Sequence, residues 1–387
     1  MNALVLHNHF NNNGGAEKVA ASVLALLKRM GFKVTLMSHD KVDWRRVSSA
    51  FGCRVEEIKP EKEIQVGLLP DGAYKRLLES VYTVVSRKNY DLIISTYAEA
   101  DRGLADINYI HYPHLYGLKE EREKVYRSSL WKLYHMPYQI LHQTLDSLTL
   151  PKSTLIVNST YTQKLAQRYI GFKPLVIHPP VDSVKISSIT RAWNKGGLKR
   201  DNIVTTIGRI APGKYLDAIP FIAAKTRSVK KFIIIGSTQH MFPDYLSHLH
   251  KTIHQLGLKD KIVILTDLPF EKKIKLMAMS RVYLHVMPNE HFGIAVVEAM
   301  AAGLVPVVHR SGGPWIDILQ RRHEYGLSYS TLEDAAYAID EILMAEEWFI
   351  DELSARAREA AIRFDEHIFN RKMRKLIELR LEDKYNN

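Results

Sequence analysis

A chain of 387 residues is too long for one ordinary hydrophobic core, so two domains of about 150–200 residues are expected. Its composition, with 46% hydrophobic and 25% charged residues, is typical of globular proteins. The single cysteine, Cys53, excludes an internal disulfide and a thiolate-clustered metal site, and it fits a reducing compartment. A net charge of +12 favours anionic partners, but no recognition-helix, zinc-finger or aromatic RNA motif accompanies it, so an anionic membrane surface is favoured over nucleic acid.

The first predicted strand covers residues 3–6, followed by a turn over 11–15 and a helix over 16–30. Gly14 and Gly15 free backbone amides at the start of this helix, where a phosphate could bind, although the motif is not GxGxxG. Glu17 in the first turn is interpreted as a residue that complements the helix dipole.

Alternation of strands, turns and helices continues through the first half of the chain and predicts a parallel sheet covered on both faces. Thr160 and Gln163 have the spacing of a capping box, which predicts a helix start at Thr160. The remaining strands in this half are expected at residues 34–37, 92–94, 108–110, 154–157 and 175–177.

Two features of this half bear on function. His111 lies at a predicted strand end, where it could hydrogen-bond a sugar hydroxyl or a developing charge, or simply pack or cap. Residues 130–148 place aromatic and leucine side chains on one helical stripe, which fits either core or a peripheral membrane contact. No apolar run approaches the roughly 20 residues of a membrane span, and we expect no signal peptide.

Residues 181–199 are polar and basic, and we expect them to link a domain over 1–180 to a second domain over 200–364. After Phe364, a basic helix at about 365–387 is expected to join the first domain. In the second domain we predict a helix at 270–279 and strands at 203–207, 232–235, 262–265, 282–286 and 305–308. The fold class is therefore α/β, with two Rossmann-like domains whose parallel sheets face a central cleft.

The loop after the first strand of the second domain, GRIAPGK, matches the spacing of a phosphate-binding P-loop. Tyr215 replaces the Ser or Thr that would hold magnesium, which argues against a P-loop ATPase. What remains is two cations, Arg209 and Lys214, suited to a diphosphate. A solvated basic loop is the alternative.

Residues 288–317 carry the most informative motif, PNEHFGIAVVEAMAAGLVPVVHRSGGPWID. A helix beginning near Phe292 would direct its first amides at a phosphate, and Gly293 would let the ligand approach the backbone. Glu290 and Glu298 would accept hydrogen bonds from ribose and sugar hydroxyls. In the alternative interpretation Glu298 only complements the helix dipole and Glu290 is a loop charge.

The sequence contains no HExxH and no two aspartates two positions apart. Cations of the protein, and not a metal, are therefore expected to neutralise a leaving diphosphate.

Three motifs together resemble the family 4 retaining glycosyltransferases of GT-B fold, over nearly the whole chain: GGAE at 14–17, the Arg209 and Lys214 pair, and the two glutamates with HFGI between them. The C-terminal motif and HYP at 111–113 are most similar to the dolichol-pathway α-1,2-mannosyltransferase branch of that family. Asp317 stands where many members carry glutamate, and Asp267 where many carry glycine.

The resemblance implies a metal-independent transfer, without a cofactor, of mannose from GDP-mannose to a hydroxyl of a lipid-phosphate- or pyrophosphate-linked glycan. It also implies a peripheral position on the cytoplasmic face of a membrane. The family has no settled protein nucleophile, and front-face displacement assisted by the leaving phosphate is the usual proposal.

The resemblance also assigns residues to roles. Glu298 would hold the donor ribose, and Glu290 with the amides of 292–294 would hold the hexose. Gly15 would line the phosphate, and His111 would contact the sugar near its anomeric carbon. The implied catalytic residues are His111, Arg209, Lys214 and Glu290. The implied donor-binding residues are Gly14, Gly15, Arg209, Lys214, Glu290, His291, Phe292, Gly293, Ile294 and Glu298.

Two alternatives stay open at this point. The same fold also serves enzymes that use a UDP-linked sugar and a soluble acceptor. A non-catalytic protein that retains a nucleotide site is the other alternative, although the glutamate pair and the two cations disfavour it.

Overall fold

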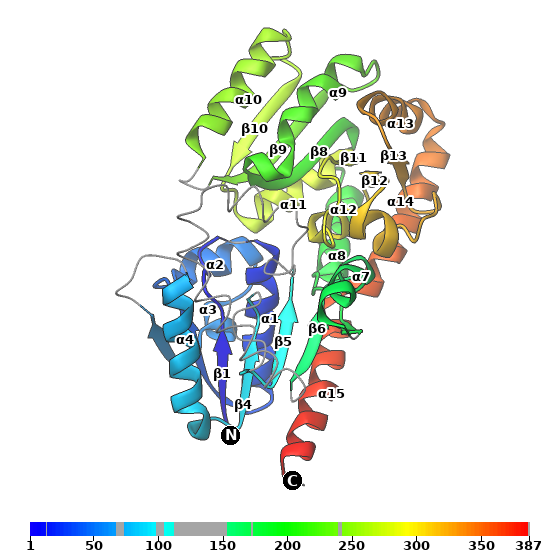
Figure 1. The fold of residues 1–387 in the computed structure, drawn as a ribbon. Helices are drawn as coiled ribbons and strands as arrows, with labels where there is room; N and C mark the ends of the chain where they lie inside the picture. The colour runs from blue at the N-terminus through cyan, green and yellow to red at the C-terminus, as the bar shows by residue number, and fades with distance from the viewer. Residues whose placement is uncertain are drawn as a thin grey trace. The chain divides into compact units, whose positions relative to one another are not determined.

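The computed structural model describes residues 1–12, 14–66, 73–97, 104–111, 153–171, 173–238 and 242–385 (Figure 1). The chain forms two compact units, each an α/β body of its own. The first consists of Met1–Ser48, Cys53–His178 and Phe369–Asn387, and the second of Ser49–Gly52 and Pro179–Ile368.

The strands of the first unit are β1 (Asn2–Leu6), β2 (Lys33–Ser38), β3 (Lys62–Gln65), β4 (Leu92–Ser95), β5 (Ile107–Ile110), β6 (Thr154–Val157) and β7 (Leu175–Val176). Those of the second unit are β8 (Asp201–Ile210), β9 (Lys231–Thr238), β10 (Ile262–Thr266), β11 (Ser280–His285), β12 (Val305–His309) and β13 (Leu327–Tyr329).

The α-helices in the first part of the chain are α1 (Gly15–Arg29), α2 (Trp44–Phe51), α3 (Val55–Ile58), α4 (Ala73–Ser86) and α7 (Thr160–Ile170). They are followed by α8 (Ser183–Lys195), α9 (Ile219–Lys225), α10 (Pro243–Gln255), α11 (Phe270–Met279), α12 (Ile294–Ala302), α13 (Leu332–Met344), α14 (Glu347–Ala361) and α15 (Glu366–Tyr385).

Both sheets have the strand order of a doubly wound fold. The first runs β3-β2-β1-β4-β5-β6-β7 and the second β10-β9-β8-β11-β12-β13, and all paired strands are parallel. In each sheet the order reverses direction beside the first strand, which is where such folds bind ligands at the carboxyl ends of the strands. The predicted class, two Rossmann-like domains with parallel sheets, is confirmed.

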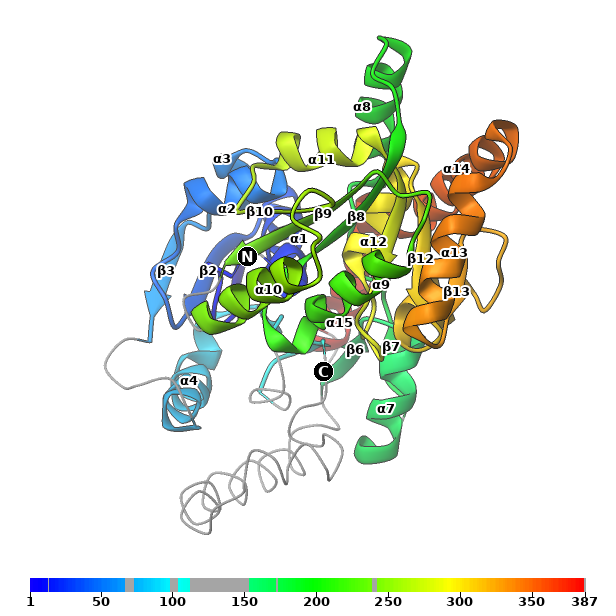
Figure 2. The ribbon, with the colours of Figure 1, turned by 90° about the horizontal axis from the view of Figure 1, so that it is seen from above.

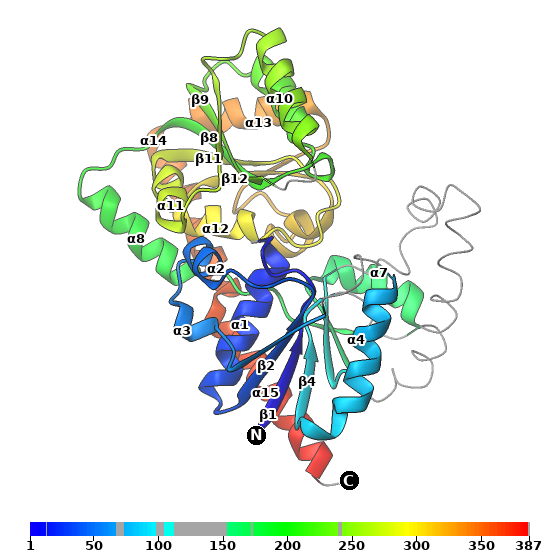
Figure 3. The same ribbon diagram turned by 90° about the vertical axis from the view of Figure 1, so that its left-hand side faces the viewer.

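Helices cover both faces of each sheet. In the first unit α1 and α4 lie on opposite faces (Figure 3). In the second, α9, α10 and α13 pack on one face and α8, α11, α12 and α14 on the other (Figure 2). Because side chains alternate along a strand, Val282 and Leu284 of β11 enter the first of these cores while Tyr283 enters the second.

The C-terminal helix α15 belongs to the first unit from Phe369 onward. Phe369 is buried, with its ring 6.2 Å from that of Tyr109 on β5. Near the end of the helix, Lys384 Nζ donates to the carbonyl of Asp91 at 2.8 Å.

The structure differs from the sequence prediction in several places. Residues 181–199, expected as a linker, contain α8, whose Ile186 and Thr190 are buried in the second unit. The cap of α7 is Ser159 and not Thr160, because Ser159 Oγ accepts from the Thr162 amide at 2.9 Å. The short edge strands β3 and β13 were not predicted. The stripe over 130–148 lies outside the described residues.

Candidate functional site

The N-terminus of α12 stands at the carboxyl edge of the second sheet, after the loop that follows β11. The helix begins at Ile294, two residues later than predicted, and Phe292 is buried in the core against Phe364. Gly293 is the N-cap, with a φ of 98° that only glycine adopts readily. The Val296 amide already donates to the Gly293 carbonyl at 3.0 Å. The two amides before it, those of Ile294 and Ala295, precede the first intrahelical acceptor and, with the positive end of the helix dipole, make an anion site.

A glycine turn after the neighbouring strand β12 holds this loop in place. The Gly313 amide donates to the carbonyl of Glu290 at 2.7 Å, and Ser311 Oγ accepts from the Asn289 amide at 2.8 Å. A Cβ added to Gly312 would stand 2.4 Å from the Glu290 carbonyl oxygen, so no side chain fits there. The two glycines of the SGG motif therefore let one loop lie directly against the other.

Lys214 and Glu290 form the central ion pair of this edge. Lys214 ends a short 3-10 turn (Pro212–Lys214) after β8, and its Nζ is 2.5 Å from Glu290 Oε2. Both side chains are largely buried, with 22% and 12% exposure. Burial alone would raise the pKa of Glu290, but the attraction of Lys214 and of neighbouring histidines outweighs it and lowers that pKa to about 2. Glu290 is therefore a carboxylate at neutral pH and an acceptor of hydrogen bonds.

His285, at the end of β11, is a neighbour of this pair that the sequence did not single out. Its Nε2 lies 3.8 Å from Glu290 Oε2 and has no hydrogen-bond partner among the described residues. Burial lowers the pKa of His285 to about 4, although the charge of Glu290 acts in the opposite direction. The imidazole is thus neutral at neutral pH.

Glu298 lies in the middle of α12, beyond its first turn, so it does not serve as a first-turn residue that complements the helix dipole, and it pairs with Lys273 of α11. Lys273 Nζ is 2.9 Å from Oε1 and 3.0 Å from Oε2 of Glu298. Lys273 was not predicted as a site residue, because nothing local connects it with a glutamate 25 positions later. A two-sided contact of this kind fixes the direction of the carboxylate.

Arg209 occupies the exposed carboxyl end of β8, level with Ser237 of β9. Its side chain forms no hydrogen bond or ion pair with the part of the chain that the structure describes. The structure thus places Arg209, Lys214, Glu290 and Glu298 in one unit, and Lys214 and Glu290 are directly bonded to each other.

Gly14 and Gly15 lie at the start of α1 in the first unit. The Gly14 amide is occupied, because it donates to Glu17 Oε2 at 2.7 Å, which is one half of a capping box. The buried carboxylate of Glu17 therefore caps the start of α1, and it does more than complement the helix dipole. Burial would raise the pKa of Glu17, but the attraction of His7, whose Nε2 lies 3.9 Å away, and hydrogen bonds from the backbone lower it.

His111 follows β5 in the same unit. Its Nε2 donates to the carbonyl of Thr96 at 3.2 Å, and its own carbonyl accepts from Asn158 Nδ2 at 3.0 Å. The ring also packs 5.1 Å from the ring of Tyr109. These contacts orient the imidazole. The roles of Gly14, Gly15 and His111 stay predictions.

Two wider properties concern only the described residues. None of their helices is both long enough and apolar enough to span a bilayer. None of their His, Cys, Asp and Glu side chains gather in threes in a way that could ligate a metal ion.

Residues 190–364 match the family model for glycosyl transferases group 1. The GDP-Man:Man(3)GlcNAc(2)-PP-Dol alpha-1,2-mannosyltransferase of Dictyostelium discoideum is 27% identical over 260 residues, which cover 63% of this chain and 50% of that protein. The protein of the same name from Candida glabrata is 30% identical over 242 residues, covering 56% and 45%. The chain spans about half the length of the curated relatives it matches.

Solved structures show the same fold over the whole chain. Anabaena Alr3699/HepE in complex with UDP and glucose superposes with a TM-score of 0.73 at 18% identity, covering 98% of this chain and 99% of that one. WaaG, a glycosyltransferase involved in lipopolysaccharide biosynthesis, gives 0.69 at 16% identity, covering 97% and 99%. The resemblance to glycosyltransferases of GT-B fold is confirmed.

The burial of His285 predicts how the stability of the protein depends on pH. Its pKa in the folded protein lies below that of the unfolded chain, so the unfolded state binds the proton first. As pH falls from about 6.5 towards 4, we expect the wild type to lose up to about 1.4 kcal/mol per pH unit relative to His285→Gln. Urea denaturation of both proteins across this range measures the difference.

The matched control is His254→Gln, which removes an exposed histidine from α10. Its stability should follow that of the wild type at every pH. Equal pH dependence of the wild type and His285→Gln would contradict the burial of a neutral imidazole beside Glu290.

Proposed function

We propose that this chain, which carries a glycosyl transferases group 1 domain, is a retaining mannosyltransferase that uses GDP-mannose and a lipid-pyrophosphate-linked glycan. The names of its curated relatives state a GDP-Man donor and a PP-Dol-linked acceptor for those proteins. The observation that carries the proposal to this chain is the bonded pair of Lys214 and Glu290 beside the N-terminus of α12.

The chemistry of this edge suits a sugar diphosphate. The helix N-terminus and the cations favour the negatively charged diphosphate, whereas an ionised Glu290 favours hydroxyl groups. Since Lys214 is bonded to Glu290, one ammonium group can contact the diphosphate while it orients the carboxylate that accepts from the sugar. Neither group needs to change its protonation state.

The other residues of the site divide in the same way between the diphosphate and the hydroxyl groups of the donor. Arg209 is exposed at the strand end and supplies a planar donor to the diphosphate. Glu298, held through both oxygens by Lys273, accepts from the ribose hydroxyls. His291, Gly293 and Ile294 line the backbone side of the donor.

In the proposed reaction, the bond between the anomeric carbon and the phosphate oxygen breaks. A bond from that carbon to the acceptor oxygen forms on the same face. The proton of the acceptor hydroxyl passes to an oxygen of the leaving phosphate, and GDP departs. Arg209 and Lys214 stabilise the charge that develops on the diphosphate, so no metal is required.

We also propose that the protein acts at the cytoplasmic face of a membrane as a peripheral protein. The net charge of +12 supports this, because cytoplasmic leaflets carry anionic lipid. A lipid-linked acceptor would also be found there.

The first test is transfer by the purified full chain in EDTA, with a panel of GDP- and UDP-linked sugars and a lipid extract as acceptor. We expect mannose to move from GDP-mannose to an extractable lipid product, detected by mass spectrometry. Thermal shift with GDP and UDP separates the two donor classes, since the bound nucleotide stabilises the fold. No transfer and no hydrolysis of any donor would contradict the proposal, and activity only after metal is restored would contradict the metal-free mechanism.

The second test separates binding from chemistry. Glu298→Ala should mainly raise the KM for the donor, by roughly tenfold, because it removes hydrogen bonds made equally in the ground and transition states. Arg209→Ala should mainly lower kcat, by about 100-fold, because the diphosphate charge develops during the reaction. Steady-state kinetics with varied GDP-mannose measures both.

Lys225→Ala is the matched control for the two variants, because it removes an exposed, salt-bridged cation from α9 of the same unit. Its kinetics should equal those of the wild type. A reversed pattern, with Arg209→Ala changing only KM and Glu298→Ala only kcat, would overturn the assigned roles.

A further inference from the structure

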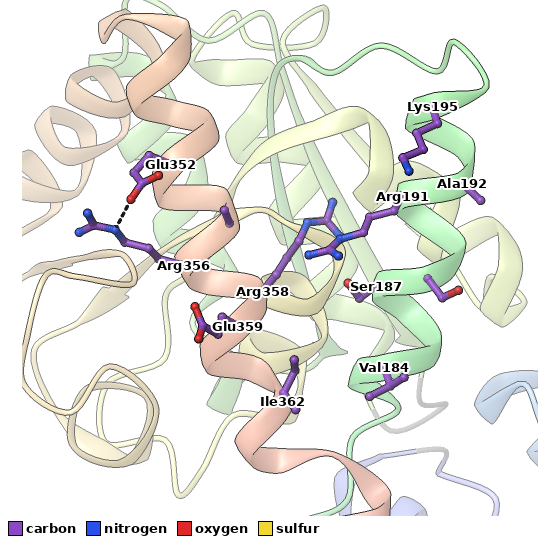
Figure 4. A pocket seen from close by; sticks show the side chains of 12 residues that line it. Val184, Ser187, Arg191, Ala192, Lys195, Glu352, Arg356, Arg358, Glu359 and Ile362 are labelled. Atoms are coloured by element: carbon purple, nitrogen blue, oxygen red, sulfur yellow. Dashed lines mark hydrogen bonds and ion pairs between the residues drawn. The ribbon is translucent and has the colours of Figure 1, made fainter.

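A second basic feature of the second unit lies between α8 and α14, away from the N-terminus of α12. A groove of about 830 Å³ opens between the two helices (Figure 4). Its charged lining consists of four cations and two carboxylates: Arg191, Lys195, Arg356, Arg358, Glu352 and Glu359. Arg356 Nε is bonded to Glu352 at 2.8 Å, so this cation is already paired.

Arg191 and Arg358 extend toward each other from opposite walls of the groove (Figure 4). Arg191 is exposed, and its side chain forms no hydrogen bond or ion pair with any residue in the described ranges. Arg358 is only 8% exposed. Burial lowers the pKa of Arg358 to about 9, and repulsion by Arg200 and Arg191 adds to this effect. Two guanidinium groups therefore face each other without a carboxylate between them.

The donors of Arg358 are only partly used. Its Nη1 donates to Thr190 Oγ1 and to the carbonyl of Ala301, both at 2.9 Å. Its Nε and Nη2 have no acceptor among the residues that the structure describes. These two atoms form the edge of a guanidinium that binds an oxyanion through two parallel hydrogen bonds. The backbone of Gly303 packs close to this edge: a Cβ there would stand 2.4 Å from both atoms, so a side chain at 303 would displace the guanidinium.

We propose that the groove between α8 and α14 is a second anion site, which binds the phosphate of a phosphate ester between Arg191 and Arg358. An oxyanion there would neutralise two facing cations and use the free edge of Arg358. The exposed Val184 and Ile362 in the wall of the groove would contact the organic part of the ligand.

The site has a direct connection to α12. Arg358 and Arg200 satisfy the last carbonyls of that helix: Arg200 donates to Ala302 and Gly303, and Arg358 to Ala301. A ligand on Arg358 would therefore restrain the C-terminal end of the helix whose N-terminus is the proposed donor site. The anion site itself does not depend on the proposed function.

The test is calorimetric titration of the full chain with inorganic phosphate and with glycerol phosphate, at constant ionic strength set by KCl. Arg191→Ala, a change at an exposed position, should weaken both by roughly tenfold or more. Arg191→Lys should weaken binding less than Arg191→Ala, since lysine keeps the positive charge but lacks the planar pair of donors of the guanidinium.

One control separates this site from general charge: Lys225→Ala should bind phosphate within about twofold of the wild type, because this cation does not line the groove. Arg209→Ala, which removes a cation of the proposed donor site, should leave phosphate binding in the groove in place. Unchanged binding by Arg191→Ala would overturn the proposal. So would complete loss of phosphate binding in Arg209→Ala, because phosphate would then occupy only the donor site.

A second experiment, with lipid vesicles, identifies whether the phosphate belongs to a lipid headgroup or to a small soluble molecule. Sedimentation of the full chain with phosphatidylcholine vesicles, with and without phosphatidic acid, is compared between the wild type and Arg191→Ala. Loss of phosphatidic acid binding in the variant supports the groove as a headgroup site. An effect of the variant on soluble phosphate alone supports a small phosphate ester as the ligand, and no effect on either overturns the site.

Discussion

The ion pair between Lys214 and Glu290 holds together two loops that follow different strands of the second sheet. One loop follows β8 and the other follows β11, and the side chain of Lys214 connects them. Both charges are largely removed from water, so loss of either partner leaves an uncompensated charge that costs about 3–5 kcal/mol. The pair therefore fixes the geometry in front of α12, and it keeps Glu290 ionised where a protonated carboxyl would be a poorer acceptor.

The helix behind this pair is held at both ends by groups from elsewhere in the chain. At its start, Gly312 and Gly313 allow the β12 turn to lie against the Glu290 loop. At its end, Gly303 has a φ of 85°, and Arg200 and Arg358 bond the last carbonyls. The positive N-terminus is thus left for a ligand while the C-terminal carbonyls are satisfied by protein cations. The same arrangement explains why Arg358 is buried at the far end of this helix from the donor edge.

Much of this fold follows from hydrophobic patterning, because buried parallel strands are short apolar runs between polar turns. The helix at 270–279 and the strand at 154–157 were predicted with their observed bounds. Edge strands such as β3 carry few apolar residues, and α8 buries only one narrow face. Hydrophobic patterning therefore predicted neither of them. Within the site, Glu290 and Lys214 were predicted from local motifs, whereas Lys273 and His285 were missed because their contacts come from tertiary packing. The capping role of Glu17 was likewise visible only through its bond to Gly14.

An experimental structure of the full chain with GDP-mannose tests the central claim most directly. The account predicts diphosphate oxygens within about 3 Å of Lys214 Nζ and of the Gly293 or Ile294 amide, with a mannose hydroxyl donating to Glu290. A diphosphate bound away from the N-terminus of α12, with the Lys214 and Glu290 pair facing no part of the donor, would contradict it.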